Sequence, residues 1–599
     1  MAVLPVVAYH AKLPGISGGF VGVDVFFVIS GFLIVSIISR EIDQNNFSIL
    51  RFYERRARRI LPALFAMVLF TCLIGLIVLL PSEFVDFPAQ VLGALFFVAN
   101  IVFWRQTNYF SDAADSNLLL HTWSLGVEEQ FYIVAPILLI ILARYLSSWR
   151  NLSIAAITIA SLLLCIALTP SFATASFYLL PTRAWELGVG AMIALGIVPS
   201  LSNRIAREIL AASGLAMILA SVVFFDSEME FPGYAALAPV IGAALVIHSG
   251  HGTRVGSILS LKPMVLVGLI SYSLYLWHWP IFVAGDLYGM LDGQVVSFAF
   301  IALALIVGWL SWRFIERPFR SSQSVSQFRL WTSSAVTALV LAIAALGMSM
   351  LNGWPQRFDQ TTLAFDAASN DISPRRDDCH ISEGLISPEE RCFLGVSDDG
   401  QEPLIVWSDS HGVEVSYALS EDAEVHSITY SGCPPILGFS WDKRPECLAH
   451  NVQVFDYLSA LPQPRQIVLA AYFDWYADTD GLVAKLVSTI SSLEDQGHSV
   501  VVMGPTPGPG ANAPKFLARG GDPEFDLASD ANGTAEVRAM LDRVDQETQA
   551  DIVRPSDLVC KGSRCSLLID GSPILFDDDH PSMTMAREIA VLIRGAIDE

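Results

Sequence analysis

The sequence predicts a multi-span α-helical membrane domain followed by an α/β domain with a doubly wound, mainly parallel sheet. The composition of the whole chain and the charge of its two parts predict this division. Of 599 residues, 53% are hydrophobic and 16% charged, and the mean hydropathy of +0.50 is too high for an ordinary soluble protein. Residues 1–350 hold 19 Lys and Arg against 18 Asp and Glu (net +1), whereas residues 351–599 hold 17 against 41 (net −24). The acidic part argues against nucleic acid as a partner, because phosphates need a basic surface.

Apolar stretches of helical length recur along the first part, and most approach the roughly 20 residues that cross a bilayer. With a shorter opening run, MAVLPVVAYH, they predict eleven or twelve spans in the lipid bilayer. The opening run has no basic leader or small-residue cleavage site, so it is interpreted as a clipped first helix and not a signal peptide. The longer stretches are residues 20–39, 60–80, 86–104, 129–143, 152–168, 182–197, 207–225, 232–248, 264–285, 294–312 and 331–350.

The charges of the short loops predict the orientation of these spans, since Lys and Arg gather on the cytoplasmic side. An acidic loop at 226–231 is expected outside. The sides do not alternate consistently between residues 81 and 128, so one element there is expected to be re-entrant or miscounted. The last span begins beside a basic loop, which places residues 351–599 outside the cytoplasm. The basic loops are residues 51–60, 144–150, 249–263 and 313–329.

The cysteines agree with an exported second part. Cys72 and Cys165 lie in apolar spans and are expected to be inert core residues. The other six lie after residue 350, and an even set in an exported domain is typical of disulfides. A zinc site is the alternative, but no CxxC occurs, so no metal is expected. Local pairing is the simplest of 15 connectivities: Cys379 with Cys392, Cys433 with Cys447, and Cys560 with Cys565.

The second part alternates strand-like and helical patterns. Apolar runs at 403–407, 466–473 and 499–507 alternate with helical patterns at 482–494 and 534–548. Strands of this kind fit a parallel sheet covered by helices on both faces, and ligands bind beyond the carboxyl ends of such strands. The motif SDSHG follows the first run directly. The more polar residues 351–402 are expected to be a linker or an irregular extension.

Ser410, in SDSHG, is a candidate nucleophile. A serine hydroxyl needs a base to take its proton and a third group to orient that base. Near the end of the chain, FDDDHPS supplies His580 and, three residues earlier, Asp577. The alternative is a solvated acidic loop with a helix cap, but the position of SDSHG at a strand end favours catalysis.

At these residues the chain resembles the SGNH hydrolase family. SDSHG resembles its GDSH block and DDDH its terminal DxxH block, over roughly residues 400–599. The resemblance implies that Ser410 is the nucleophile, His580 the base and Asp577 its orienting partner. Ser408 replaces the usual glycine, and Gly432, in YSGCPP, is the match for the oxyanion-hole glycine. The block that usually supplies an oxyanion asparagine falls near 470–476, which contains no Asn, and a missing donor can cost roughly 10²–10³ in rate.

The first part resembles the membrane acyltransferase family 3 across nearly all of residues 1–320, with Met1 in the place of an arginine usual in that family. The fusion of the two families is similar to bacterial O-antigen and envelope-polysaccharide O-acetyltransferases. It divides the chain into a membrane acyltransferase domain (1–325), a further transmembrane helix and linker (326–400) and an SGNH-like periplasmic domain (401–599). The matching segments are AVLPVVAYH, GGFVGVDVFFVISGFLI, FYERRARRILPA, HTWSLGVEEQFY, SYSLYLWHWP and FIERPFR.

Ionisable residues within apolar spans are candidate functional groups, because they are expensive in lipid. His10 ends an apolar helix, where the alternative is a histidine reaching the interface. Asp24 has no charged neighbour in the sequence. His278 lies among aromatic residues and has packing as its alternative. The other candidates bracket a helix start: His121, Glu128 and Glu129.

Arg55, Arg56 and Arg59 match an R-R-x-x-R pattern of the membrane family. Guanidinium groups bind phosphates well, so the resemblance favours contacts to the phosphates of coenzyme A. The alternative is that these residues, with Arg58, only anchor the cytoplasmic side.

These features together predict an O-acyltransferase in the bacterial inner membrane. We expect an acetyl group to pass from cytoplasmic acetyl-CoA, with His10 as base or acyl acceptor, to Ser410 in the periplasm. Ser410 would deliver it to a hydroxyl of an envelope polysaccharide such as lipopolysaccharide O-antigen. No tightly bound cofactor is expected. The alternatives are a membrane-anchored polysaccharide O-acetyl esterase, a transporter with an accessory sugar-binding domain, and a structural anchor, which would need only one span.

Overall fold

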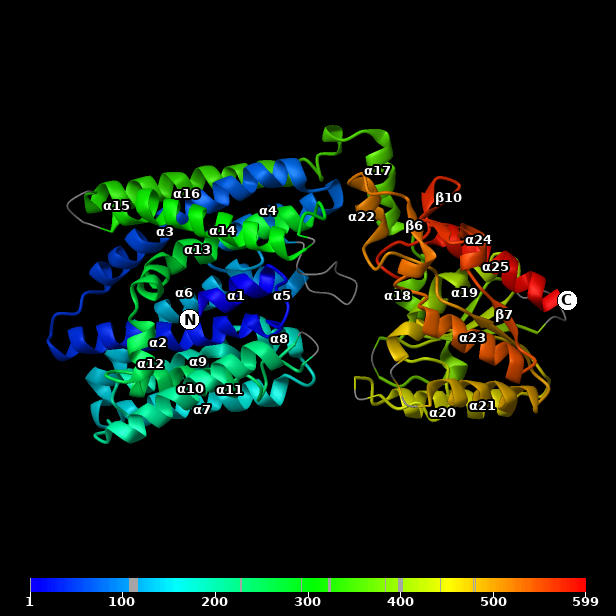
Figure 1. Ribbon diagram of the computed structural model, residues 1–599, viewed down its shortest axis with the longest axis horizontal. Helices are drawn as coiled ribbons and strands as arrows, with labels where there is room; N and C mark the ends of the chain where they lie inside the picture. Colours follow the sequence, from blue (N-terminus) through cyan, green and yellow to red (C-terminus); the bar gives the residue numbers. More distant parts are fainter. Residues whose placement is uncertain are drawn as a thin grey trace. The chain divides into compact units, whose positions relative to one another are not determined.

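The computed structural model divides the chain into two units, Met1–Trp354 and Pro355–Glu599 (Figure 1). Met1 and parts of the loops predicted at 226–231 and 313–329 lie outside the described residues. The structure describes residues 2–106, 117–226, 229–291, 293–320, 325–382, 384–396, 402–441, 443–477, 479 and 481–598.

The first unit is α-helical. Among the described residues, eight helical segments are long and apolar enough to cross a membrane. They are α2 with the turn before it (Gly19–Asp43), α3 (Ile49–Val78), α6 (Thr122–Tyr145), α7 with the turn before it (Ser147–Leu168), α10 (Arg204–Phe224), α13 (Lys262–Asp286), α14 to α15 (Gln294–Phe319) and α16 (Gln327–Ser349). The shorter helices are α1 (Val3–His10), α4 (Pro81–Leu95), α5 (Ala99–Gln106), α8 (Ala173–Tyr178), α9 (Leu180–Ala194), α11 (Leu237–Ser249) and α12 (Arg254–Leu259).

The predicted count of eleven or twelve full-length spans is therefore not matched within the described residues. The stretch 86–104, predicted as one span, is broken into α4 and α5, and Phe97 between them has a φ of 57° that no helix can contain. This break lies between residues 81 and 128, where one element was expected to be miscounted. The stretches 182–197 and 232–248 contain helices of only 15 and 13 residues.

Helices α2 and α9 pack closely because both carry glycines at the contact. A Cβ at Gly31 would lie 1.9 Å from the carbonyl oxygen of Leu187, and one at Gly190 would lie 2.1 Å from that of Val28. Small residues that let helix backbones approach are typical of membrane proteins. The contact brings Asp24 of α2 beside Arg183 of α9.

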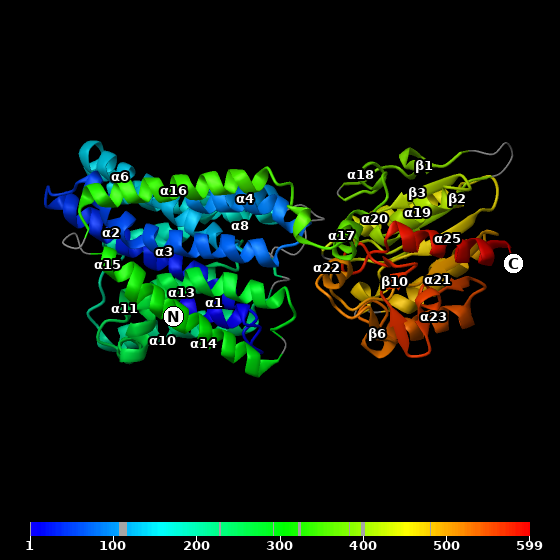
Figure 2. The same cartoon turned by 90° about the horizontal axis from the view of Figure 1, so that it is seen from above.

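The second unit has a six-stranded sheet in the order β1-β3-β2-β4-β5-β7. Strands β2 to β5 and β7 are parallel, and β1 is antiparallel at one edge. Strands β1, β3 and β2 lie side by side in Figure 2. The predicted doubly wound sheet is confirmed, while the antiparallel edge strand was not predicted. The strands are β1 (Cys392–Leu394), β2 (Leu404–Ser408), β3 (Val425–Thr429), β4 (Gln466–Ala470), β5 (Ser499–Met503) and β7 (Asp551–Val553).

Helices cover both faces of this sheet, and alternate strand residues point to each. Ile405 and Trp407 pack with α20 (Cys447–Ser459), α21 (Leu482–Glu494) and α23 (Ala535–Glu547). Leu404 and Val406 pack with α19 (Val413–Leu419) and α25 (Met583–Asp598) on the other face. Smaller elements are α22 (Ala513–Ala518), α24 (Ser556–Val559), a sheet of β6 (Glu524–Asp526), β9 (Arg564–Ser566) and β8 (Cys560–Lys561), and a hairpin of β10 (Leu568–Ile569) and β11 (Ser572–Pro573).

The segment predicted as a linker is mostly part of the second unit. It contains α17 (Gln360–Ala367), α18 (Arg376–Cys379) and β1, and Phe365 packs against the core. The polar composition of the segment did not indicate that it belongs to the folded unit, because short elements at a sheet edge bury few side chains. The three local disulfides are confirmed: Cys379–Cys392, Cys433–Cys447 and Cys560–Cys565. Cys72 and Cys165 are buried free thiols.

Candidate active site

Ser410 lies directly beyond the carboxyl end of β2, in the short turn Ser410–Gly412, and is 6% exposed. Asp409 caps this turn, because its carboxylate accepts the N–H of His411 at 2.9 Å. Gly412 is required here, since a Cβ would lie 2.3 Å from the hydroxyl oxygen of Ser408. The sequence around the serine thus fixes the backbone of the turn that carries Ser410.

The structure brings the predicted serine, histidine and aspartate together. His580 Nε2 is 2.9 Å from Ser410 Oγ, and His580 Nδ1 is 2.9 Å from Asp577 Oδ2. The other Asp577 oxygen accepts the N–H of His580 at 2.8 Å and that of Asp579 at 3.1 Å, which folds the loop before α25. A base can take the serine proton in this geometry while a carboxylate holds the base.

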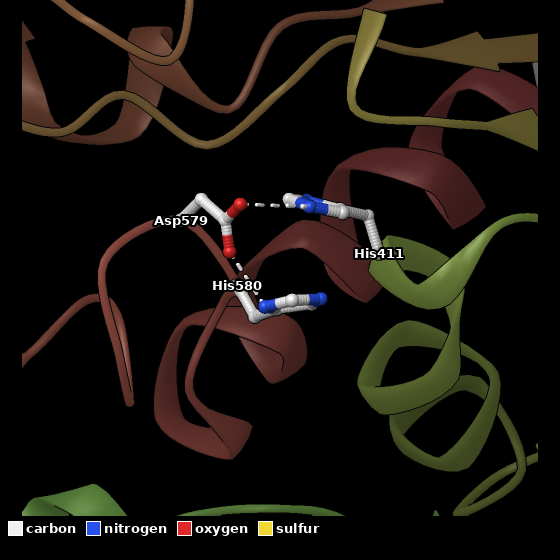
Figure 3. A group of neighbouring side chains, drawn as sticks. All are labelled: His411, Asp579 and His580. Carbon is white, nitrogen blue, oxygen red and sulfur yellow. Dashed lines mark ion pairs between the residues drawn. The ribbon is translucent and has the colours of Figure 1, made fainter. Parts of the chain in front are cut away.

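Asp579 is a second carboxylate at the same histidine, which the sequence reasoning did not single out. One of its oxygens is 2.6 Å from His580 Nδ1, and the other is 3.9 Å from His411 Nε2 (Figure 3). Burial lowers the pKa of His580, but Asp577 and Asp579 outweigh it and hold that pKa well above 6.5. The signal available in the sequence was the third acidic residue of DDDH.

His411 and Tyr472 support this base from one side. The His411 ring stacks on His580 at 4.3 Å and on Tyr472 at 4.9 Å between centroids. Burial lowers the pKa of His411 to about 3, so the ring is neutral. Asp409 ties the two segments together, because it also accepts the N–H of Tyr472 at 2.8 Å and the hydroxyl of Tyr476 at 3.0 Å. Burial raises the pKa of Asp409 to about 6.

The backbone N–H groups of Ser410 and Gly432 are candidates for the oxyanion hole. Neither donates a hydrogen bond to any group in the described part of the chain. Gly432 follows β3, the neighbour of β2, and has a φ of 63°, which favours glycine. The segment 470–476 supplies no third donor from Tyr472, since its N–H is bound to Asp409.

Three potential metal ligands meet at this site: His411, Asp579 and His580 offer atoms within 4.8 Å of one another. The same atoms already serve the base, because His580 Nδ1 is hydrogen-bonded to Asp577. These groups therefore orient His580 as a base. The expectation from the sequence that no metal binds stays a prediction.

The membrane unit contains two cavities that share wall residues. One, of about 480 Å³, is lined by Arg55, Arg56 and Arg59. The other, of about 560 Å³, is lined by His10, Asp24, His121 and Arg183. The shared wall residues are Val6, Val23 and Tyr275.

The arginines of the first cavity differ in their partners. Arg55 pairs with Glu41 at 2.9 Å, and Arg56 pairs with Glu129 at 3.0 Å. Arg59 forms no ion pair or hydrogen bond within the ranges that the structure describes. Arg58 does not line the cavity: it is buried and bound to Glu54 and to the carbonyl of Val325.

Glu128 lines the first cavity, and Glu129 is connected to it through Arg56. Glu128 accepts hydrogen bonds from Ser30 Oγ at 2.6 Å and from the Tyr132 hydroxyl. The two neighbouring acids thus have different partners, since Glu129 holds Arg56.

Asp24 belongs to a buried charge cluster that the sequence reasoning found only in part. Its carboxylate is 3.1 Å from Arg183 Nη2, and Arg183 Nη1 is 3.2 Å from Glu186. The signal was the pair of charges three residues apart in PTRAWELG, inside an apolar stretch. Four aromatic rings surround the guanidinium at 5.6–5.7 Å: Phe27, Trp123, Phe177 and Phe231.

Three predicted histidines lie close together: His10 and His121 line the second cavity, and His278 is buried behind them. His10 Nδ1 is 3.1 Å from His278 Nε2, and the ring of His121 is 6.0 Å from that of His278. Neither nitrogen of His121 has a hydrogen-bond partner among the described residues. The edge of Trp279 packs against His10 at 4.5 Å.

Comparison with known families follows the division of the chain. Residues 1–313 match a family described as an acyltransferase domain, and residues 378–594 match one described as an SGNH domain fused to such membrane domains. The chain belongs to this acyltransferase family. The match covers more than half of the chain and includes the two cavities and the histidine cluster.

Named relatives of this acyltransferase include two peptidoglycan enzymes. The peptidoglycan O-acetyltransferase OatA of Listeria monocytogenes is 28% identical over 58% of the chain and 61% of the relative. The putative peptidoglycan O-acetyltransferase YrhL of Bacillus subtilis is 32% identical over 67% and 70%. The chain thus spans about three fifths of the Listeria relative's length.

Two further comparisons are less extensive. A putative membrane-bound transacylase BcsY of Komagataeibacter xylinus is 33% identical over 53% of the chain and 80% of the relative. A solved periplasmic domain of a lipopolysaccharide acetyltransferase, from Salmonella serovar Paratyphi A, aligns with 41% of the chain at 15% identity and a TM-score of 0.32. The similarity to this solved structure is too low to support a conclusion about the chain.

Proposed function

We propose that this protein is a membrane O-acyltransferase that moves an acetyl group from cytoplasmic acetyl-CoA to a hydroxyl of an envelope polysaccharide. The observation that carries the proposal is the presence of two separate chemical centres in one chain. The membrane unit has an arginine-lined cavity beside buried histidines, and the second unit has an oriented Ser410. A donor and an acceptor on opposite sides of a membrane would require both.

The proposed location is the bacterial inner membrane, with the second unit in the periplasm. Three disulfides in that unit support an oxidising compartment. The basic segment 51–60, predicted as a loop, forms the first turns of α3, and positive charge at this end of a span supports the same orientation.

In the membrane unit, Arg55, Arg56 and Arg59 would bind the phosphates of acetyl-CoA. Of the three, Arg59 has no hydrogen bond or ion pair among the residues that the structure describes. His10 would act on the thioester from the neighbouring cavity, as base or as acyl acceptor. The acyl carbon would bond either to a nitrogen of His10 or to an acceptor hydroxyl whose proton His10 takes. The carbon–sulfur bond breaks in the same step, and CoA leaves on the cytoplasmic side as a thiolate, which can take up the released proton.

In the second unit, His580 would take the proton of Ser410 as the serine oxygen attacks the incoming acyl carbon. His580 must first be neutral, although its pKa is held well above 6.5. The bond between the acyl carbon and its carrier would break, and His580 would give its proton to the departing carrier group. The acyl-serine would then be attacked by a sugar hydroxyl. His580 accepts that proton and returns it to Ser410, which is released. Asp577 holds the ring throughout.

The acceptor we propose is a glycan hydroxyl, with lipopolysaccharide O-antigen as the expected example. The names of the Listeria and Bacillus relatives point to peptidoglycan as the other candidate. A polysaccharide O-acetyl esterase would use the same triad, but it would leave the arginine cavity and the histidine cluster of the membrane unit without a role.

Labelled acetyl-CoA tests the proposal. Membranes with and without the protein are supplied with the labelled donor, and O-acetyl groups are measured on purified lipopolysaccharide and on purified peptidoglycan. We expect one of the two polymers to be labelled when the protein is present, and neither to be labelled when the protein is absent. Unlabelled polymers that lose acetate when the protein is present would identify an esterase instead.

A further inference from the structure

We propose that His278 is a positioning residue for His10: it fixes the tautomer of His10 so that the Nε2 lone pair is directed to the second cavity. The inference rests on the proposed function, in which His10 acts on the acyl donor. Both roles considered for His10, base and acyl acceptor, need an imidazole nitrogen without a hydrogen.

The backbone of α13 determines which nitrogen of His278 carries the hydrogen. His278 is fully buried, and its Nδ1 is 2.7 Å from the carbonyl oxygen of Tyr275 and 3.2 Å from that of Leu274. A carbonyl oxygen can only accept a hydrogen bond, so Nδ1 must be the N–H. In a neutral imidazole, Nε2 then has a lone pair and can only accept.

The tautomer of His278 in turn determines the tautomer of His10. Its Nδ1 is 3.1 Å from His278 Nε2, so Nδ1 of His10 must donate. The Nε2 of a neutral His10 is therefore left with a lone pair. This nitrogen has no hydrogen-bond partner in the described part of the chain, and His10 lines the cavity of about 560 Å³.

His278 is fully buried and His10 is partly buried. A charge removed from water without a partner is expensive, so both rings are neutral. Neither His10 nor His278 forms an ion pair within the described ranges. The two ring planes differ by 16°, and Trp279 packs against His10 from the side. Two neighbouring residues of α13, His278 and Trp279, thus hold His10, which lies 268 positions before His278 in the chain.

The arrangement gives His278 the part that a carboxylate plays in a serine–histidine–aspartate triad. In such a triad the third residue keeps the base in the correct tautomer. When Nε2 of His10 takes the proton of an attacking hydroxyl, the hydroxyl oxygen bonds to the acyl carbon and the carbon–sulfur bond breaks. The resulting imidazolium keeps its Nδ1 hydrogen bond to His278 and can give the new proton to the CoA thiolate.

A pair of amide variants separates positioning from packing. The amide of Gln extends as far as Nε2 of a histidine, so His278→Gln can offer His10 an oxygen acceptor. The shorter amide of Asn reaches only the Nδ1 position, so His278→Asn can keep the bond to the Tyr275 carbonyl but cannot reach His10. Both side chains are neutral and polar, which makes each the control for the other.

The measurement is CoA release from acetyl-CoA by the full-length protein in membranes, per mole of folded protein recovered as a monodisperse peak. We expect His278→Gln to stay within about tenfold of the wild-type kcat. We expect His278→Asn to lose roughly 10²–10⁴ in kcat, the range for a general base, with its KM for acetyl-CoA unchanged. Equal losses in the two variants, or a loss confined to KM, would overturn the inference.

His10→Ala distinguishes this inference from the proposed function. If His10→Ala abolishes CoA release while the two His278 variants behave alike, His278 does not position His10 and the proposed function stands. If His10→Ala releases CoA at the wild-type rate, the proposed role of His10 fails and the inference fails with it.

Discussion

Two carboxylates face one nitrogen of His580, and this decides how the site should respond to pH. A base works only when it is unprotonated. Asp577 and Asp579 favour the protonated ring and hold the pKa of His580 well above 6.5. Acyl transfer through Ser410 should therefore increase with pH through the neutral range.

Asp579→Asn should move the acid limb of the pH–rate profile to lower pH, because one of the two charges that raise the pKa of His580 is removed. The measurement is hydrolysis of an activated acetyl ester by the full-length protein, as a function of pH. Asp545→Asn, on the exposed face of α23, is the matched control. An acid limb that stays in place would show that Asp579 does not act on His580.

Ser410→Ala and His10→Ala should fail in different ways. Ser410→Ala should abolish acetylation of the glycan by roughly 10⁴–10⁶, as loss of a triad member does, while acetyl-CoA can still be consumed. His10→Ala should abolish the consumption of acetyl-CoA. CoA release and O-acetyl groups are measured together for each variant. Normal glycan acetylation by Ser410→Ala would assign the transfer chemistry to the membrane unit alone.

At the level of single elements, helix α3 carries both arginines that line the cavity and one arginine with a structural role. Arg59→Gln should raise the KM for acetyl-CoA, because Arg59 lines the cavity and has no partner within the described ranges. Arg58→Gln should lower the amount of protein in the membrane with little change in KM, since Arg58 is buried against Glu54 and Val325. If the two variants have the same KM for acetyl-CoA, Arg59, like Arg58, only anchors the cytoplasmic side of the protein.

The sequence predicted elements best where the pattern was local and repeated. The strands after 403, 466 and 499 were found because their apolar runs are continuous, and Ser410, Asp577 and His580 were found because their motifs are short. The break between α4 and α5 was missed, since Phe97 adopts its left-handed conformation without a glycine to signal it. Arg183 was missed because its partner Asp24 lies on another helix, and Glu186 was missed with it because it pairs with Arg183.

At the level of the whole molecule, the disulfides test the orientation of the second unit. All six cysteines after residue 350 should be oxidised in protein taken from intact cells, while the buried Cys72 and Cys165 remain thiols. Thiol alkylation of the unfolded but unreduced protein, followed by mass spectrometry, measures both groups at once. Six free thiols in the second unit would contradict a periplasmic location.

Removing one bridge should weaken the second unit without affecting the first. Replacing Cys433 and Cys447 with alanine should lower the free energy of unfolding by ~2–5 kcal/mol. Thermal unfolding followed by protease resistance of the second unit measures the change. The double alanine variant of Cys72 and Cys165, which form no disulfide, is the control.

The wall formed by Val6, Val23 and Tyr275 has a thermodynamic consequence. These side chains belong to both cavities, so a ligand that displaces them from one side alters the space on the other. Binding at the two sites is then coupled, and linkage requires the coupling to be reciprocal: the factor by which an occupied arginine cavity changes affinity at the histidine cavity equals the factor in the opposite direction. A ligand in either cavity would therefore change the affinity of the other cavity for its own ligand.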